Sequence, residues 1–318
     1  MTLNSQDKIY TDEIAARKHL EKLLWPDGPV CPHCGSLDAA TKLKGKSTRP
    51  GVYWCNACQK PYSVTVGTVY ERSHIPLHKW LYATHLLTSS KKGISAHQLM
   101  RMLGLGSYHS AWFMAHRIRE GMAPSNPPQI GGEGKTVEAD EMYIGNKVGK
   151  RKAPGAGGYA HKRAILALVE RSGAVRSAAI DSPTRYEIRP LMDQHVHFAT
   201  TKVYTDGSNC YRFMPVSQHE SVDHSKGEYV RYTKNGKVHT NTVEGVFSIF
   251  RRGMTGIYQH CGEQHLGRYL AEFDFRYSNR AKLGIDDAMR ADIALKGITG
   301  KRLTYRRTVQ AEASSAAS

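Results

Sequence analysis

Four cysteines restrict the fold of this chain more than any other feature of its sequence. They stand as two C-x-x-C pairs, Cys31 with Cys34 and Cys55 with Cys58, and 20 residues separate the pairs. Two thiolates three residues apart can face one ion across a tight turn, and two such turns complete the tetrahedral set of four sulfurs that zinc prefers. A coincidence of two pairs and a dithiol redox motif are the alternatives. In a reducing compartment the arrangement favours a metal over disulfides.

A zinc ion bound by four cysteines has no open coordination position, so the predicted zinc is structural. Residues 37–53, between the pairs, contain alternating and turn-forming stretches, as expected for a small β-ribbon. The ion would hold about 40 residues, which are too few to form a core alone. Zinc ribbons bind DNA, RNA or protein, so the ligands do not name the partner.

The chain is strongly basic, with 45 Lys and Arg residues against 28 Asp and Glu residues and a net charge of +17. Such an excess attracts polyanions, and nucleic acid is the partner that it favours. A merely well-solvated surface is the alternative. An anionic membrane is disfavoured because no basic amphipathic helix stands out. At 318 residues, 40% of them hydrophobic, the chain is long enough for two or three domains with a sizeable core.

The sequence predicts no membrane segment. Its first residues are polar and mixed in charge, unlike a secretory signal. The longest aliphatic run, residues 164–169, is far shorter than a membrane span. We therefore expect a soluble, cytoplasmic protein.

Residues 93–120 predict a helix, a short turn and a second helix. Gly104 and Gly106 interrupt the helical pattern. Ser95 and Ser107 suit the N-caps of the two helices. That layout is typical of a helix-turn-helix, whose second helix can lie in a DNA major groove. Basic residues would make the DNA contact, although any surface helix can carry them: Arg101, Arg117 and Arg119.

The last two thirds of the chain follow a Pro-, Asn- and Ser-rich stretch at residues 123–130, which predicts a domain boundary. Strands and helices then alternate, so we expect an α/β or α+β fold with a mixed sheet. The expected strands lie near residues 137–143, 164–170, 174–180 and 202–206, with a helix over residues 183–196 between the last two.

A long hairpin is expected between the first two of these strands, because the segment is rich in glycine and cations. It suits a DNA phosphate backbone, and a solvated loop is the alternative. Its cations are Lys147, Lys150, Arg151, Lys152, Lys162 and Arg163.

Two aspartates fall at strand positions, Asp140 within the first strand and Asp206 at the end of the fourth. Aspartate is a poor strand former, so its presence beside apolar residues indicates a functional site. For Asp140 the alternative is an exposed acidic edge, since Glu138 and Glu141 are its neighbours. For Asp206 the alternative is a turn before Gly207.

A third carboxylate lies in the stretch "HTNTVEGVFSIFRRG", where Asn241 and Glu244 have the spacing of a capping box. Apolar residues at helical spacing support a helix here. Arg251 lies seven residues after Glu244, about 10.5 Å along the axis, so the two share a face. Capping accounts for Asn241 and Glu244, but it does not explain Arg251 or the two aspartates.

These blocks together resemble a known family. "VEADEMYIG", "VYTDGSNCY" and "HTNTVEGVFSIFRRG" are similar to the catalytic blocks of bacterial insertion-sequence transposases with an ISXO-like domain. The "CPHCGS…CNAC" ribbon ahead of them is also typical of that group. The resemblance covers roughly residues 15–282 and is specific because four blocks occur in order. It implies an RNase H-like fold and DDE phosphoryl transfer on DNA.

The resemblance implies that Asp140, Asp206 and Glu244 are the three catalytic acids, with 37 residues between the last two. They would hold two Mg²⁺ or Mn²⁺ ions about 3.5–4 Å apart. Some related transposases have Asn in the third place, so Asn241 is the alternative to Glu244. Arg251 stands where the family usually has Lys, and it keeps the charge for a phosphate contact.

The resemblance also implies partners and domains. The partners are the terminal inverted repeats of the element and target DNA, bound by a homo-oligomer. Two rivals remain: a zinc-ribbon DNA-binding regulator with an inactive catalytic domain, and a junction-cutting or RNase H-type nuclease. The expected domains are a zinc-ribbon region (1–72), a helix-turn-helix region (73–125), an RNase H-like DDE domain (131–282) and a basic C-terminal tail (283–318).

Overall fold

The computed structural model describes residues 7–155, 157–215, 217–234 and 236–304. The chain divides into two compact units. We call them the ribbon unit, with residues 7–84, 96–121 and 292–304 of the described chain, and the sheet unit, with residues 85–95 and 122–291. Among the described residues, none of the helices has the length and apolar character needed to cross a membrane.

The ribbon unit begins with helix α1 (Glu13–Leu24), capped by Asp12, whose Oδ1 accepts from the backbone N–H of Ala15 at 2.6 Å. The predicted β-ribbon is confirmed as a three-stranded antiparallel sheet. An aromatic cluster packs beside it, where the ring centroids of Trp25, Tyr53 and Tyr62 lie 5.7–5.8 Å apart. The strands are β1 (Ala40–Lys42), β2 (Tyr53–Cys55) and β3 (Lys60–Tyr62).

The two helices expected within residues 93–120 are present. Ser107 caps the second of them, since its Oγ accepts from the backbone N–H of Ser110 at 3.1 Å. Gly104, in the turn, has a φ of +57°, a conformation that glycine adopts without the steric cost of a side chain. The helices of this region are α2 (Leu77–Ser89), α3 (Ala96–Leu103) and α4 (Tyr108–Met122).

Two of the three arginines expected to contact DNA from these helices are buried, so that expectation is wrong for them. Arg117 is 9% exposed and Arg119 is 2% exposed. The Arg117 guanidinium donates to the backbone carbonyl oxygens of Val69 and Glu71. Arg117 therefore holds the chain that precedes α2, and only Arg101 has the exposed side chain that a DNA contact needs.

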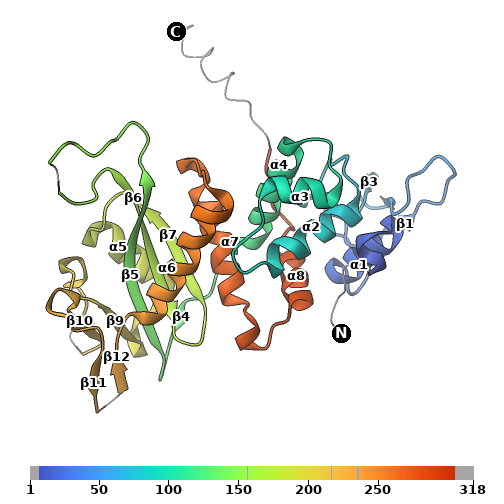
Figure 1. Cartoon of the computed structure of the whole chain (residues 1–318). Coiled ribbons are helices and arrows are strands. Elements are labelled where there is room, and N and C mark those ends of the chain that lie inside the picture. The colour runs from blue at the N-terminus through green and yellow to red at the C-terminus, as the bar shows by residue number, and fades with distance from the viewer. Residues whose placement is uncertain (1–6, 156, 216, 235, 305–318) are drawn as a thin grey trace, which may run out of the picture. The chain divides into compact units, whose positions relative to one another are not determined.

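The sheet unit is built on a five-stranded mixed sheet in the order β10-β9-β5-β6-β7 (Figure 1). β6 is antiparallel to both of its neighbours, whereas β9 is parallel to β5 and to β10. The four predicted strands are confirmed, and β10 extends the sheet. Their bounds are β5 (Thr136–Asn146), β6 (Lys162–Glu170), β7 (Val175–Ile180), β9 (Lys202–Asp206) and β10 (His219–Val222).

Helices cover both faces of this sheet, and the alternation of β5 decides which residues meet them. Val137 and Ala139 pack on the side of α5 (Arg185–His195), the helix predicted between β7 and β9. Met142 packs on the opposite side, against α6 (Asn241–Gly253) and α7 (Leu266–Ser278). The sheet is therefore the middle layer of an α/β/α sandwich.

Smaller elements complete the described structure. β4 (Ile130–Gly131) pairs in parallel with β8 (Val196–His197). β11 (Arg231–Thr233) and β12 (Gly236–Val238) form a hairpin that leads directly into α6. Residues 287–296 of the predicted C-terminal tail form helix α8 (Asp287–Lys296), and residues 305–318 of that tail lie outside the described residues.

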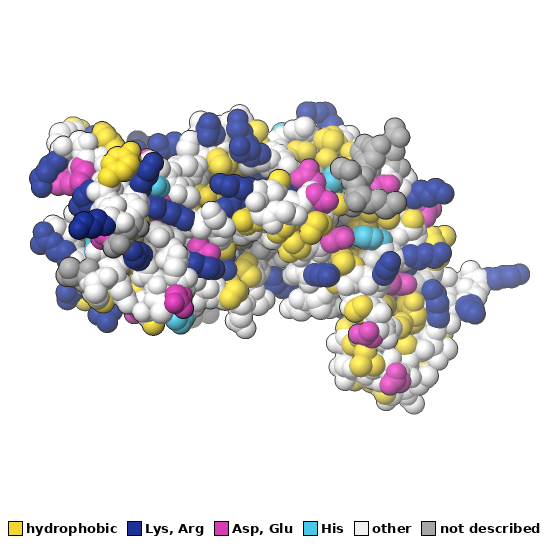
Figure 2. Space-filling model, turned by 90° about the horizontal axis from the view of Figure 1, so that it is seen from below, with side chains coloured by type: hydrophobic (Ala, Val, Ile, Leu, Met, Phe, Trp, Pro, Cys, Tyr) yellow, Lys and Arg dark blue, Asp and Glu magenta, His cyan; other side chains and the backbone are white. Residues whose placement is uncertain are grey.

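The described surface is rich in cations. Figure 2 shows Lys and Arg side chains at many places on the visible face and acidic side chains at fewer. In the β5–β6 hairpin, Lys150, Arg151 and Lys152 are exposed. Lys147 and Arg163 are used within the protein, since they donate to the carbonyl oxygens of Asp181 (2.7 Å) and Cys261 (2.9 Å). Part of the predicted phosphate-binding loop is thus available to a partner and part anchors the loop.

Candidate functional site

The four predicted zinc ligands come together at one point of the ribbon unit. Their sulfur atoms all lie within 4.8 Å of one another. The Sγ atoms of Cys31 and Cys58 are 3.7 Å apart, and those of Cys34 and Cys55 are 3.6 Å apart. A zinc ion bonded at about 2.3 Å to four tetrahedral sulfurs separates those sulfurs by about 3.8 Å. The cluster therefore fits a structural Zn²⁺, and none of its four cysteines is in a disulfide.

A second cluster of possible metal ligands lies where β5 and β9 run side by side. The parallel register pairs Val137 with Val203 and Glu138 with Tyr204. Continued by two residues, it brings Asp140 level with Asp206. Carboxylate oxygens of Asp140, Asp206 and Glu141 all lie within 4.8 Å of one another. The two predicted aspartates are thus neighbours, although 65 residues separate them in sequence.

The carboxylates of the acid cluster repel one another. Burial, followed by the negative charge of Asp206, raises the pKa of Asp140 to about 8. Burial also raises the pKa of Glu141. Like charges held this close in a partly buried place favour protonation of one of them. A hard divalent cation such as Mg²⁺ or Mn²⁺ removes the repulsion and takes carboxylate oxygens as its preferred ligands, so the cluster fits such an ion.

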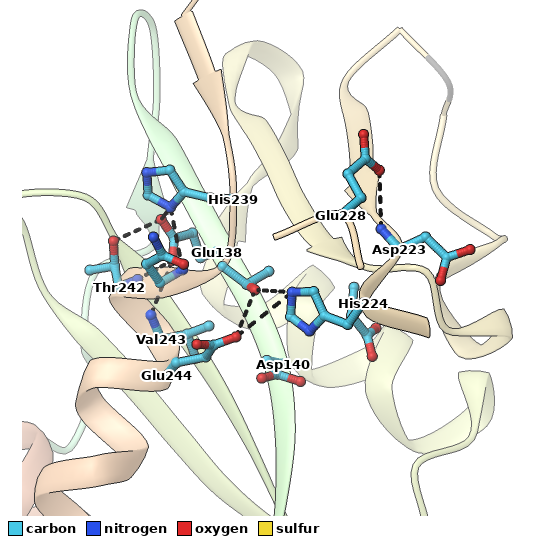
Figure 3. A network of polar contacts seen from close by, with 12 residues as sticks. Glu138, Asp140, Asp223, His224, Glu228, His239, Thr242, Val243 and Glu244 are labelled. Carbon is cyan, nitrogen blue, oxygen red and sulfur yellow. Dashed lines mark hydrogen bonds and ion pairs between the residues drawn. The ribbon is translucent and has the colours of Figure 1, made fainter. Parts of the chain in front are cut away.

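The Glu244 side chain, on α6, lies near this cluster. It is not one of the three acids whose carboxylate oxygens lie within 4.8 Å of one another. Its negative charge contributes to the raised pKa of Asp140, and Figure 3 shows its carboxylate beside Asp140. The Glu244 side chain is 47% exposed. Its Oε1 accepts from the Thr240 hydroxyl at 3.3 Å and lies 3.8 Å from Nε2 of His224.

The cap of α6 differs from the sequence expectation. The helix begins at Asn241, and its N-cap is Thr240, whose side chain makes no capping hydrogen bond. Asn241 is therefore not the N-cap. The capping acceptor is the carboxylate of Glu138 in β5, which accepts from the backbone N–H groups of Thr242 and Val243 (Figure 3). The predicted capping box is not formed, because the helix begins one residue earlier than expected and the Glu244 N–H donates to the Thr240 carbonyl oxygen at 3.1 Å.

The other two predicted residues of α6 are exposed. Asn241 lies in the first turn, and its backbone N–H donates to Nδ1 of His239 at 3.3 Å. Arg251 lies about two turns after Glu244, with its side chain open to solvent. Both can therefore reach a ligand outside the protein.

Sequence analysis missed the part that Glu141 and Cys210 play at this site. Glu141 was interpreted only as an acidic neighbour of Asp140, yet its carboxylate belongs to the close group. Cys210 is buried and its thiol donates to Oε1 of Glu141 at 3.5 Å. Burial raises the pKa of Cys210 to about 12, so the thiol keeps its proton. The adjacency of two acids in "ADEM" was the available signal for Glu141, whereas no local pattern points to Cys210.

Two regions of the chain match known protein families. Residues 131–278 match the family described as the ISXO2-like transposase domain. This part of the chain is therefore similar to an ISXO2-like transposase domain. Asp140, Asp206 and Glu244 all lie inside it. Residues 11–61, with the four cysteines, match the transposase zinc-ribbon domain.

A relative of similar length supports the same conclusion. A protein of Halobacterium salinarum, described as an uncharacterized protein in transposable element ISH50, is 29% identical over 286 residues. The aligned part is 85% of this chain and 92% of the relative. The similarity thus extends over both the zinc ribbon and the transposase domain.

Proposed function

We propose that this protein is a DDE transposase that cleaves DNA at the ends of its insertion sequence and joins them to target DNA. The observation that carries the proposal is the convergence of Asp140 and Asp206 on adjacent parallel strands, with Glu244 beside them on α6. The strand order supports an RNase H-like fold for this domain, since an antiparallel β5-β6-β7 meander is followed by β9 and β10, parallel to β5.

In this proposal Asp140, Asp206 and Glu244 hold two Mg²⁺ or Mn²⁺ ions, and Glu141 supports them from the same cluster. When bound, the ions would lower the pKa of the attacking water or 3′-hydroxyl group and stabilise the leaving 3′-oxygen. Arg251 contacts a phosphate near the scissile bond, for which a guanidinium fork is well suited. Water as nucleophile frees the 3′ end of the element, and that 3′-hydroxyl then attacks a phosphodiester bond of the target.

The ribbon unit binds the terminal inverted repeats in this proposal. A zinc ribbon and the α3–α4 helical pair provide two candidate DNA-binding elements, and the net charge of +17 favours a polyanion. Arg101 is the exposed arginine of α3 for this contact. Joining two ends of one element requires that they be held together, so we propose a homo-oligomer on DNA.

The test is a cleavage and strand-transfer assay with the full, zinc-loaded chain. The substrate is DNA that carries the repeats flanking its gene, with Mg²⁺ or Mn²⁺. Asp140→Asn, Asp206→Asn and Glu244→Gln are compared with Asp193→Asn, a control at an exposed surface ion pair of α5. We expect full metal-dependent cleavage by the wild type and the control alone, and reduced cleavage by the three variants.

The outcomes separate the candidate functions. DNA binding by the wild type without cleavage would identify a DNA-binding protein with an inactive catalytic domain. Cleavage of branched DNA or RNA–DNA hybrids without end joining would identify a nuclease.

A further inference from the structure

Glu138 is a fully buried carboxylate that the proposed chemistry does not use. It lies in β5 two residues before Asp140, and its side chain has no exposed surface. Its Oε2 accepts from the backbone N–H groups of Thr242 at 2.7 Å and Val243 at 3.0 Å, and its Oε1 accepts from the Thr242 hydroxyl at 2.7 Å. These N–H groups are among the four that the start of a helix leaves unsatisfied, and a negative charge there is favourable.

Arg171, just after β6, compensates the buried charge and extends the network. Its Nε donates to Oε1 of Glu138 at 2.6 Å. The same guanidinium donates to the carbonyl oxygens of Lys237 at 2.9 Å and His239 at 3.0 Å. Arg171 therefore ties Glu138 to the segment that enters α6. A buried carboxylate such as Glu138 is tolerated because a charged partner and additional hydrogen bonds satisfy its oxygen atoms.

Capping by Glu138 leaves the side chain of Thr240 available for another contact. An N-cap threonine ordinarily uses its hydroxyl oxygen to accept from an N–H of the first turn. Here the Thr240 hydroxyl instead lies 3.3 Å from Oε1 of Glu244 and 3.4 Å from Nε2 of His224. Figure 3 shows the two residues that this hydroxyl approaches, His224 and Glu244, near Asp140.

We propose that Glu138 is a positioning residue for the third acid of the site. By capping α6 from β5, it fixes the first turn of the helix relative to the strand that carries Asp140. It thereby frees the Thr240 hydroxyl to orient Glu244 toward Asp140. This inference rests on the proposed function. The alternative is that Glu138 contributes only to stability, like any buried and paired carboxylate.

Two variants separate the steps of this proposal. Glu138→Gln keeps the shape of the side chain and removes its charge. Thr240→Val removes the hydroxyl and leaves the Glu138 cap in place. Asp274→Asn is the matched control, because Asp274 of α7 also accepts from a backbone N–H (Ser177, 2.6 Å) and a hydroxyl (Ser177, 2.7 Å), on β7 rather than α6.

The measurements use the full, zinc-loaded protein. Hydrogen exchange measures the protection of the backbone N–H groups in the first turn of α6. Electron paramagnetic resonance measures Mn²⁺ affinity. DNA binding and cleavage are assayed with the flanking repeats. In Glu138→Gln we expect faster exchange at residues 241–244 and a loss of about 10–100-fold in Mn²⁺ affinity and cleavage, with DNA binding kept. Thr240→Val should lose cleavage without faster exchange. Asp274→Asn should change neither α6 exchange nor Mn²⁺ affinity.

Three results would overturn the inference. Unchanged exchange in Glu138→Gln would mean that Glu138 does not anchor α6. Faster exchange with unchanged Mn²⁺ affinity and cleavage would reduce Glu138 to a stabilising role, as would equal losses in Asp274→Asn. A wild type that neither binds Mn²⁺ nor cuts DNA would instead refute the proposed function, and the exchange data would still decide whether Glu138 anchors α6.

Discussion

The zinc ribbon and the acid cluster both bring several candidate metal ligands to one point, but they do so over very different lengths of chain. All four cysteines lie between residues 31 and 58, as two pairs whose members are three residues apart. The acids come from β5, β9 and α6, between residues 140 and 244. A local turn is enough to form each cysteine pair, whereas the acid cluster exists only once the sheet has formed. The first site should therefore depend on its metal for folding, and the second on the fold for its metal.

Removal of the zinc should have the largest effect. Structural zinc contributes about 10–16 kcal/mol of binding free energy to small zinc modules, and this free energy is coupled to folding. Cys55→Ser should therefore lose the bound zinc and the hydrogen-exchange protection of β2 and β3. Protection of β5 and β6 should remain, since they belong to the other compact unit.

The control for this prediction is Cys261→Ser, which alters a cysteine outside the ribbon. Zinc content is measured by atomic emission. Loss of protection in β5 and β6 of Cys55→Ser would contradict the division into a metal-dependent and a metal-independent region.

Neutralising either aspartate of the sheet should have the next largest effect, on catalysis rather than folding. Asp140→Asn and Asp206→Asn should each lower cleavage by about 10³-fold or more, because the ions would supply several kcal/mol of transition-state stabilisation. DNA binding should be unchanged, since it is assigned to the ribbon unit and to cationic side chains such as Arg251, not to these acids. Single-turnover cleavage and gel-shift assays measure the two properties, and parallel loss of both would contradict the separation.

When Mg²⁺ is absent, the stability of the wild type should fall with rising pH because of Asp140, and Asp140→Asn should lack this contribution. The pKa of Asp140 is about 8 in the folded state and about 4 when unfolded. A raised pKa contributes stability that is fully present below about pH 4 and is lost as pH rises through about 8. Asparagine is neutral throughout, so the variant should be more stable than wild type near pH 9, by on the order of a few kcal/mol.

Thermal unfolding of the zinc-loaded protein between pH 4 and pH 9 checks this prediction. Added Mg²⁺ should stabilise the wild type more than the variant at high pH. Equal stability of the two proteins at pH 9 would mean that ionisation of Asp140 does not lower the free energy of unfolding.

Three substitutions test which residue is the third catalytic acid. Glu244→Gln should lower cleavage about 10–100-fold, and Glu141→Gln should have a smaller effect because its carboxylate is a supporting member of the cluster. Asn241→Asp should leave cleavage nearly unchanged. If Asn241→Asp alone were inactive, or Glu141→Gln were the most damaging, the assignment of Glu244 would be wrong.

The smallest effect is expected at Arg251. Arg251→Ala should weaken binding to DNA by about 1 kcal/mol. It should also reduce the slope of log affinity against log salt concentration by about 1, the change expected for one lost phosphate contact. Arg251→Lys should retain the affinity and the slope of the wild type. Arg252→Ala is the neighbouring control, because the Arg252 Nε already donates to the Ser248 carbonyl oxygen at 3.1 Å. Equal losses in the two alanine variants would indicate a general charge effect.

Most elements of the sheet unit were predictable because their signals are local. The apolar runs of β6 and β7 and the alternation of β5 follow from the period of a strand, and α6 follows from helical spacing. The error at the α6 cap has a physical cause. Asn241 and Glu244 have the right spacing, but the helix begins one residue earlier than that box requires. Glu138, 104 residues before Thr242 in sequence, caps it through the N–H groups of Thr242 and Val243. The error at Arg117 is similar, since a basic residue on a helix may face solvent or the core, and burial depends on what packs there.

The sequence by itself determined the zinc ligands, the order of the main strands and helices, the basic character and the three candidate acids. Each of these depends on residue type and short spacing, which the chain carries before it folds. The tertiary structure decided that Asp140 and Asp206 are neighbours, that Glu141 and Cys210 belong to the site, and that Glu138 caps the helix of Glu244. Those facts depend on strand register and on which elements pack together. Register and packing are set by burial of the whole apolar core, so no local pattern encodes them.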